Sequence, residues 1–294
     1  MKAGVCLLAL AASLAAAEIK SKWNVRDHIP LAQFTVQSHR GAGVLSPENS
    51  LEAFDIAWKL ATVPEADLRA TKDDVIVAFH DNDFRRILPQ SGEATKARRI
   101  EDLTWDEVRK LDIGAWKGPE FAGQRVPRMT DMYRILAKHP GRRLYIDIKN
   151  ADLTQLAHES ARVHRQLILA STDYAVIHQW KELAPSSATL HWMGGTEEEL
   201  AARFVQLRKA GFAGITQLQI HVRPNAEGAT PGDRFMVAAG EELRAHGILF
   251  QALPWQSADP KLFHRLMDLG VASFATDYPD VAMRAIREYY GQKK

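Results

Sequence analysis

Cysteine is almost absent from this chain of 294 residues, which contains only Cys6. Cys6 lies in an apolar run over residues 5–14, and the small residues Ala15 to Ala17 follow that run. This order is typical of a secretory signal peptide, so we predict that residues 1–17 are a signal peptide removed before Glu18. The mature chain would then have no cysteine, which excludes disulfide bonds and thiol chemistry. We therefore expect a periplasmic or secreted protein.

Long hydrophobic runs and a strong net charge are absent as well. The N-terminal apolar run is well short of the roughly 20 residues that a membrane span needs, so we expect no transmembrane segment in the mature chain. The alternative to a signal peptide is a short apolar helix of the fold. The formal net charge is only +2 and no basic run occurs, so we expect no nucleic-acid partner. No glycine-rich nucleotide-binding motif follows a predicted strand, so a nucleotide-binding function loses its main support.

Short apolar runs alternate with amphipathic segments along the remaining chain. The predicted strands are 34–38, 63–70, 75–79, 144–148, 167–171, 188–192, 214–222, 248–253 and 271–275. The predicted helices are 50–60, 152–166, 173–183, 196–210, 234–246, 261–269 and a segment from Pro279. With the region around Glu65 counted as one strand, about eight β/α units result, which is typical of a (β/α)8 TIM barrel. An open, doubly wound parallel sheet is the alternative.

Residues 83–128 interrupt this alternation. The stretch is charged and contains a short predicted helix near Trp105 to Leu111. We interpret it as an insertion over the barrel mouth, between the second and third β/α units. The domain organisation that we predict is therefore a signal peptide over residues 1–17 and a single TIM-barrel domain over residues 18–294.

Three acidic residues lie at strand ends, where barrel enzymes carry their chemistry. Glu65 and Asp67 are two residues apart on one strand, so their side chains point the same way. Asp147 and Lys149 repeat this spacing on a later strand. Clustered carboxylates repel one another unless a cation joins them, and oxygen ligands favour a hard ion such as Ca²⁺ or Mg²⁺. The alternative is that these acids are exposed or paired in salt bridges.

Two histidines also end predicted strands. His39 follows the first strand and His80 follows the run over residues 75–79. Histidine can donate or accept a proton at neutral pH, and cleavage of a phosphodiester needs one group for each transfer. Arg40 and Lys149 could neutralise the non-bridging phosphate oxygens. These residues together predict metal-assisted cleavage of a phosphodiester.

Several sequence motifs carry a family resemblance. They are His-Arg-Gly at 39–41, Pro-Glu-Asn-Ser at 47–50, the run from Glu65 to Asp81, Asp-Ile-Lys at 147–149 and Thr-Asp-Tyr-Pro at 276–279. With these motifs the chain resembles the glycerophosphodiester phosphodiesterase family over almost its whole mature length. The resemblance implies a (β/α)8 barrel that binds one divalent cation. It also implies hydrolysis of a small-molecule glycerophosphodiester to glycerol 3-phosphate and an alcohol.

The resemblance also implies roles for particular residues. His39 and His80 match the catalytic pair of the family, and Glu65 and Asp67 match two metal ligands. The third metal ligand of the family is normally Glu, whereas this chain has Asp147, whose side chain is shorter by one methylene. In the segment over residues 253–255, Trp255 matches a tryptophan near the substrate.

Two rival functions and some further pocket residues remain open. One rival is a phospholipase D-like enzyme of the same barrel type that acts on lysophospholipids or sphingolipids. The other is a barrel that binds phosphorylated ligands without turnover, against which the two histidines argue. Further residues could line the pocket or simply pack in the fold: His191, Trp192, Gln219, His221, Trp116 and Phe121.

Overall fold

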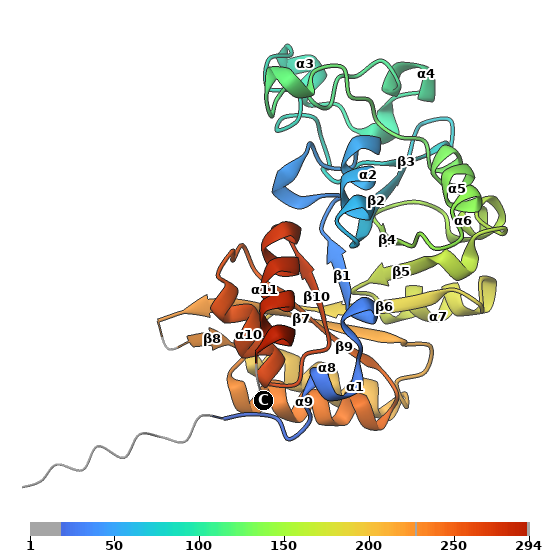
Figure 1. The fold of residues 1–294 in the computed structure, drawn as a ribbon. Helices are drawn as coiled ribbons and strands as arrows, with labels where there is room; N and C mark the ends of the chain where they lie inside the picture. The colour runs from blue at the N-terminus through green and yellow to red at the C-terminus, as the bar shows by residue number, and fades with distance from the viewer. Residues whose placement is uncertain (1–18, 227, 293–294) are drawn as a thin grey trace, which may run out of the picture.

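Eight parallel strands form a closed barrel in the computed structural model of this protein, which describes residues 19–226 and 228–292 (Figure 1). The barrel strands are β1 (Thr35–Ser38), β2 (Val63–Ala70), β4 (Leu144–Ile148), β5 (Leu167–Ser171), β6 (Ala188–Met193), β7 (Gln217–Asn225), β9 (Leu249–Pro254) and β10 (Ser273–Thr276). Strand β1 pairs in parallel with both β2 and β10, so the eight parallel strands close into a ring. The predicted (β/α)8 fold is confirmed, and the open sheet is excluded.

A helix follows each barrel strand and packs on the outside of the barrel. These helices are α2 (Leu51–Lys59), α5 (Met129–Lys138), α6 (Leu153–Glu159), α7 (Tyr174–Leu183), α8 (Glu197–Lys209), α9 (Asp233–Ala245), α10 (Pro260–Asp268) and α11 (Pro279–Gly291). Local sequence sets several helix starts. Ser50 caps α2 by accepting a hydrogen bond from the Ala53 amide, and Thr196 forms a capping box with Glu199 at the start of α8.

The remaining elements are short. They are α1 (Val25–His28), β3 (Ile76–Ala78), α3 (Glu93–Lys96), α4 (Trp105–Val108), β8 (Gly228–Thr230) and the 3₁₀ turns at Leu31–Gln33, Gly43–Leu45, Ile100–Asp102, Pro119–Phe121 and His164–Gln166. The predicted helix over 152–166 is shorter in the structure. It ends at Glu159, next to Ser160, whose hydroxyl donates a hydrogen bond to the Leu156 carbonyl. Such side-chain bonds compete with the helical ladder.

The alternation of side chains along each strand separates an apolar outer layer from a polar interior. On β4, Leu144 and Ile146 belong to the main hydrophobic core. Tyr145 has the opposite orientation, and its hydroxyl donates to Gln217 Oε1 over 2.7 Å. Gln251 continues this buried network, because its amide donates to Ser273 Oγ over 3.0 Å. The barrel is therefore filled below the site by side chains that hydrogen-bond to each other.

The predicted insertion lies between β3 and α5, and we refer to residues 83–128 as the insertion (Figure 1). Strand β3 pairs antiparallel with β2, and α5 is the helix that follows β2 around the barrel. The insertion therefore lies inside the second β/α unit, rather than between the second and third units as predicted. Phe84, Ile100 and Val108 of the insertion pack with Val77 of β3 in a small hydrophobic core that is separate from the main one.

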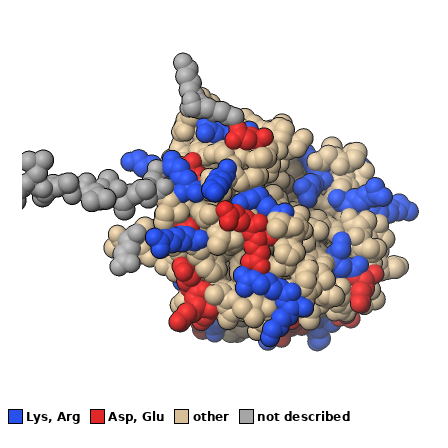
Figure 2. Space-filling model, turned by 90° about the horizontal axis from the view of Figure 1, so that it is seen from below, with Lys and Arg blue, Asp and Glu red and all other residues tan. Residues whose placement is uncertain are grey.

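Charged side chains of both signs are interspersed on the face of the molecule shown in Figure 2. That face consequently carries no large field of one sign. None of the helices within residues 19–226 and 228–292 is long and apolar enough to span a bilayer. The predicted signal peptide, residues 1–17, lies outside the described residues.

Candidate active site

The predicted site residues converge at the carboxyl ends of the barrel strands. His39 and Arg40 follow β1, Glu65 lies on β2 and His80 follows β3. A central cavity of about 130 Å³ is lined by His39, Arg40, Glu65, His80, Asp147, Lys149, Trp192, Gln219, His221 and Trp255, among others. Asp67 is fully buried beside these residues. Barrel closure therefore brings together side chains that are far apart in the sequence.

The loop after β1 has a tight, specific conformation. Gly43 has φ of 57°, and a Cβ there would lie 2.0 Å from the Asp277 carbonyl oxygen, so only glycine fits. Asn49 also has a positive φ, and its side chain makes two hydrogen bonds with Asp67. Its amide donates to Asp67 Oδ2 over 2.8 Å, and its oxygen accepts from the Asp67 backbone N–H over 2.9 Å. Asn49 therefore fixes the position of the Asp67 carboxylate.

Three buried carboxylates form one acidic cluster. Glu65, Asp67 and Asp147 are 5 %, 0 % and 6 % exposed, and each offers an oxygen within 4.8 Å of the others. Burial, and then the charge of Asp67, raise the pKa of Glu65. Burial also raises the pKa of Asp147 to about 7, and the neighbouring carboxylates add to that effect despite Lys149. Burial opposes ionisation of Asp67 too, but Lys149 and other cations outweigh it and lower the pKa of Asp67 to about 2.

These carboxylates fit a divalent cation. Lys149 Nζ lies 2.7 Å from Asp147 Oδ2 and 3.1 Å from Asp67 Oδ1, so one ammonium pairs with two of the three acids. Among the described residues, Asp67 Oδ1 finds no donor with hydrogen-bond geometry. Fully ionised, the three acids and Lys149 sum to a formal charge of −2. A buried set of oxygen ligands with this charge can hold a hard divalent ion.

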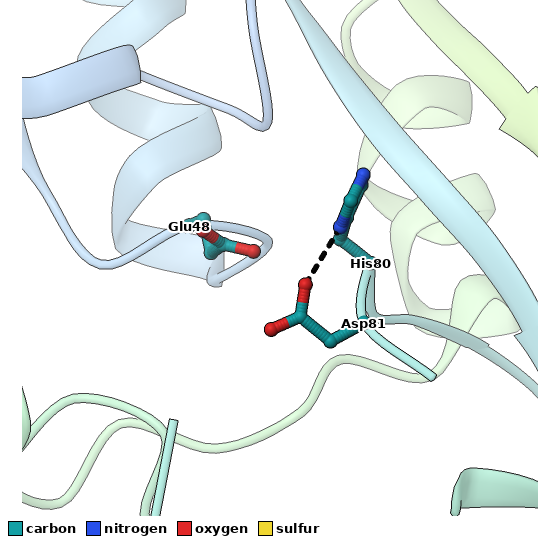
Figure 3. A group of neighbouring side chains, drawn as sticks. All are labelled: Glu48, His80 and Asp81. Atoms are coloured by element: carbon teal, nitrogen blue, oxygen red, sulfur yellow. Dashed lines mark hydrogen bonds and ion pairs between the residues drawn. The ribbon is translucent and has the colours of Figure 1, made fainter. Parts of the chain in front are cut away.

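Each candidate catalytic histidine is held by a carboxylate at Nδ1. His39 Nδ1–H donates to Asp277 Oδ1 over 2.6 Å, and its Nε2 lies 4.0 Å from Glu65 Oε2. Burial alone would lower the pKa of His39, but Glu65 and Asp277 outweigh it and raise the pKa to about 9. His80 Nδ1–H donates to Asp81 Oδ1 over 2.8 Å (Figure 3). Asp277 therefore fixes the orientation of the His39 imidazole, and Asp81 fixes that of His80.

An ion-pair network supports His80 from the insertion side. Arg86 donates to both oxygens of Glu48 over 2.7 Å and to Asp81 over 2.8 Å. Arg40 also pairs with Glu48 and donates to His80 Nε2 over 2.8 Å. Glu48, His80 and Asp81 lie close enough to be grouped as possible metal ligands (Figure 3), but arginines already hold both carboxylates. The group is therefore better described as the support of His80.

Three aromatic rings form another part of the cavity wall. Trp192 stacks on His221 with ring centroids 5.2 Å apart, and His221 contacts Trp255 at 5.4 Å. The Arg223 guanidinium lies 5.3 Å from the ring centre of Trp255. Burial lowers the pKa of His221 to about 4, so this imidazole is neutral at physiological pH.

Of the further residues that the sequence suggested for the pocket, some line a cavity and others do not. Trp192, Gln219 and His221 line the central cavity, whereas His191 is buried and donates from Nδ1 to the Ser171 carbonyl over 3.1 Å. Trp116 lines a second cavity beside His39, and Phe121 lines neither cavity.

The sequence pattern indicated no role for several residues that the structure places in or beside the site. They include Asn49, Asp81, Arg86 and Asp277. Asp277 immediately follows β10, so the strand-end rule that selected His39 would also have selected Asp277. Asn49 and Asp81 lie in loops, where the sequence pattern gives no direction for a side chain.

Comparison with known proteins identifies the family. Residues 39–281 match the Glycerophosphoryl diester phosphodiesterase family, so the chain belongs to that family, as predicted. The chain is similar to the glycerophosphodiester phosphodiesterase of Bacillus subtilis, with 24 % identity over 274 residues that cover 86 % of both chains. It is also similar to the human lysophospholipase D GDPD1, with 25 % identity and 82 % of each chain covered.

Solved structures share the fold. A phosphodiesterase from Oleispira antarctica, solved in complex with the product sn-glycerol-3-phosphate, superposes with a TM-score of 0.66 and 23 % identity. The match covers 86 % of this chain and 96 % of the Oleispira chain. At this identity the likeness establishes the barrel fold and no more.

Proposed function

We propose that this protein hydrolyses glycerophosphodiesters to glycerol 3-phosphate and an alcohol. The observation that carries the proposal is the position of His39 and His80, which line one cavity together with Glu65 and Asp147 of the buried acidic cluster. Family membership and the names of the relatives support the same activity. One histidine would take a proton from the attacking hydroxyl or water, and the other would give a proton to the leaving alcohol.

We propose that Glu65, Asp67 and Asp147 hold one divalent cation, Ca²⁺ or Mg²⁺. When bound, the cation would supply Lewis-acid stabilisation of charge on the phosphoryl group. Asp147 has a shorter side chain than the glutamate expected from the family resemblance, and the buried Asp67 carboxylate is fixed by Asn49. The geometry of the ligand set would therefore depend on Asp147.

Other residues of the cavity would bind the substrate. Arg40 and Lys149 line the central cavity, where their charges would stabilise the non-bridging phosphate oxygens. Trp255 borders both cavities and is 36 % exposed, so its ring would pack against the substrate.

A turnover assay tests this proposal. Release of glycerol 3-phosphate is measured with a panel of glycerophosphodiesters, with Ca²⁺, with Mg²⁺ and with excess EDTA. We expect metal-dependent release that EDTA abolishes. Absence of release from every ester with either metal would contradict the proposed function and favour a barrel that binds phosphorylated ligands without turnover.

A phospholipase D-like activity on lysophospholipids or sphingolipids is the second candidate. The similarity to a human lysophospholipase D supports it. Parallel assays with lysophosphatidylcholine and glycerophosphocholine separate the two, because only the first carries an acyl chain. Faster turnover of the acylated ester would favour the second candidate.

We also propose that the protein is exported to the periplasm or secreted. The support comes from the sequence of residues 1–17, in which a lysine precedes an apolar run and small residues follow it.

A further inference from the structure

A second cavity of about 520 Å³ adjoins the candidate catalytic centre. His39, Arg40 and Trp255 line both cavities, so the two lie side by side. Trp116 and Lys117 of the insertion form part of its outer wall. If the proposed function holds, one substituent of the phosphodiester extends from the centre into this second cavity.

Lys117 gives this cavity a positive charge. Its Nζ donates one hydrogen bond, to the Ser46 carbonyl over 2.8 Å. Within residues 19–226 and 228–292, no carboxylate lies within ion-pair distance of this ammonium. Burial lowers the pKa of Lys117, and Glu48 opposes that shift. An ammonium that lacks a paired carboxylate repels a second cation in the same cavity.

The two carboxylates that line the cavity already have partners. Glu48 accepts two hydrogen bonds from Arg86 and pairs with Arg40, and Asp277 accepts from His39 over 2.6 Å. Basic groups of the protein therefore already offset much of the attraction that these two acids would exert on a cationic ligand.

Lys117 can also donate hydrogen bonds to a ligand in this cavity. Its ammonium has three N–H groups, and among the described residues it gives one of them, to the Ser46 carbonyl. The other N–H groups favour a ligand that carries hydroxyl or carboxylate oxygens.

The tryptophans beside the cavity already interact with cations of the protein. The Arg86 guanidinium and the Lys117 ammonium lie 5.5 and 6.0 Å from the centre of the Trp116 ring. On Trp255, Arg223 lies 5.3 Å from the ring centre. A quaternary ammonium is usually bound by aromatic rings that carry no other cation, whereas each of these two rings already has a protein cation nearby.

We propose that this cavity is a head-group subsite that selects hydroxyl-rich or anionic alcohols and disfavours choline-type cations, with Lys117 as the residue that determines this specificity. The proposal rests on the proposed function and refines it. It concerns the relative rates of esters that differ in the charge of the alcohol.

A pair of isosteric esters isolates the effect of charge. Glycerophosphocholine carries a trimethylammonium group, and the 3,3-dimethylbutyl ester of glycerol phosphate carries an uncharged tert-butyl group of nearly the same shape. The two alcohols differ in leaving-group reactivity, so the informative quantity is the change in the ratio of kcat/KM between wild type and variant. This ratio does not depend on the fraction of folded enzyme, because both esters are measured with one preparation.

In Lys117→Met we expect the choline-to-neutral ratio of kcat/KM to rise roughly 3- to 10-fold, since one repulsive charge is removed at close range. Lys117→Glu should raise the ratio further, and Lys117→Arg should preserve it. Lys110→Met is the matched control, because Lys110 is an exposed lysine of the same insertion, and it should leave the ratio unchanged.

The outcomes separate this inference from the proposed function. An unchanged ratio in both Lys117→Met and Lys117→Glu, with both esters hydrolysed, would overturn the subsite assignment alone. Failure of wild type to hydrolyse any ester would instead overturn the proposed function.

Discussion

At the scale of single residues, the site depends on carboxylates with different partners. Asp277 and Asp81 hold the histidines, whereas Glu65, Asp67 and Asp147 form the acidic cluster. The environments of these groups shift their pKa values in opposite directions, because burial penalises every charge while neighbouring cations outweigh that penalty at only some of the acids.

The two histidines provide the first prediction. Because a proton transfer to or from a positioned side chain contributes typically about 10²–10⁴-fold, His39→Ala and His80→Ala should each lower kcat by about that factor. Turnover of the best glycerophosphodiester measures the effect. His139→Ala is the control, because His139 is exposed. Near-normal turnover in either His39→Ala or His80→Ala would remove that residue from the proposed pair.

Asp147 provides the second prediction. Asp147→Asn removes one negative charge from the acidic cluster, so the dissociation constant for Ca²⁺ or Mg²⁺ should rise by at least about tenfold. Asp147→Glu restores the ligand type expected from the family resemblance. It should keep activity and change the preference between the larger Ca²⁺ and the geometrically stricter Mg²⁺.

Calorimetric titration of metal into apo-protein tests the Asp147 prediction. Asp106→Asn, which alters an exposed acid of the insertion, is the control. A dissociation constant that is the same in Asp147→Asn and wild type would show that Asp147 only pairs with Lys149.

At the scale of elements, periodicity predicted the order of strands and helices but not every boundary. Strand β7 extends to Asn225 and forms an antiparallel hairpin with β8, whereas the apolar pattern indicated an end at Val222. The last residues of β7 are exposed, so no apolar alternation marks them. Apolar periodicity reports burial against the barrel, and it therefore misses strand segments that project from it.

Strand β6 provides a third prediction through His191, which burial holds neutral with a pKa lowered to about 4. The ordinary pKa of a histidine is about 6.5. At a pH well above this value, the His191 imidazole is neutral in both the native and the unfolded state, so it adds no pH dependence to the stability. As the pH falls from 6.5 to 4, the unfolded state binds the proton first, so the native state loses stability. The loss from this residue is about 3 kcal/mol at most.

Urea unfolding at several pH values measures this effect. His191→Asn keeps a side-chain N–H for the Ser171 carbonyl but cannot titrate, so its free energy of unfolding should fall less between pH 6.5 and 4 than that of wild type. Other titrating groups cancel in this difference. Parallel pH profiles for the two proteins would show that His191 is protonated as easily in the native state as in the unfolded chain.

At the scale of the whole molecule, barrel closure joins the two ends of the chain. Asp277 hydrogen-bonds to His39 across 238 positions of the sequence, because β1 lies beside β10. The site therefore cannot form from the first half of the chain alone, although that half carries most of the recognisable motifs.

Export provides the fourth prediction, and it concerns the whole chain. Expressed in a bacterium with its own N-terminus, the mature protein should begin near Glu18 and be recovered in the periplasmic fraction. N-terminal sequencing together with fractionation measures this. A cytoplasmic protein that retains Met1 would contradict the signal-peptide prediction, and a variant with Leu7→Arg and Leu8→Arg, which disrupts the apolar run, should stay in the cytoplasm.

The sequence by itself determined the (β/α)8 fold, the family and the set of candidate residues, including His39, His80 and the three acids. It could do so because apolar periodicity and strand-end motifs are local properties of the chain. Only the tertiary structure decided which groups contact one another: Asn49 with Asp67, Asp277 with His39, and the insertion beside the second cavity. Such contacts depend on barrel closure and on loop conformation, and no local pattern in the sequence encodes either one.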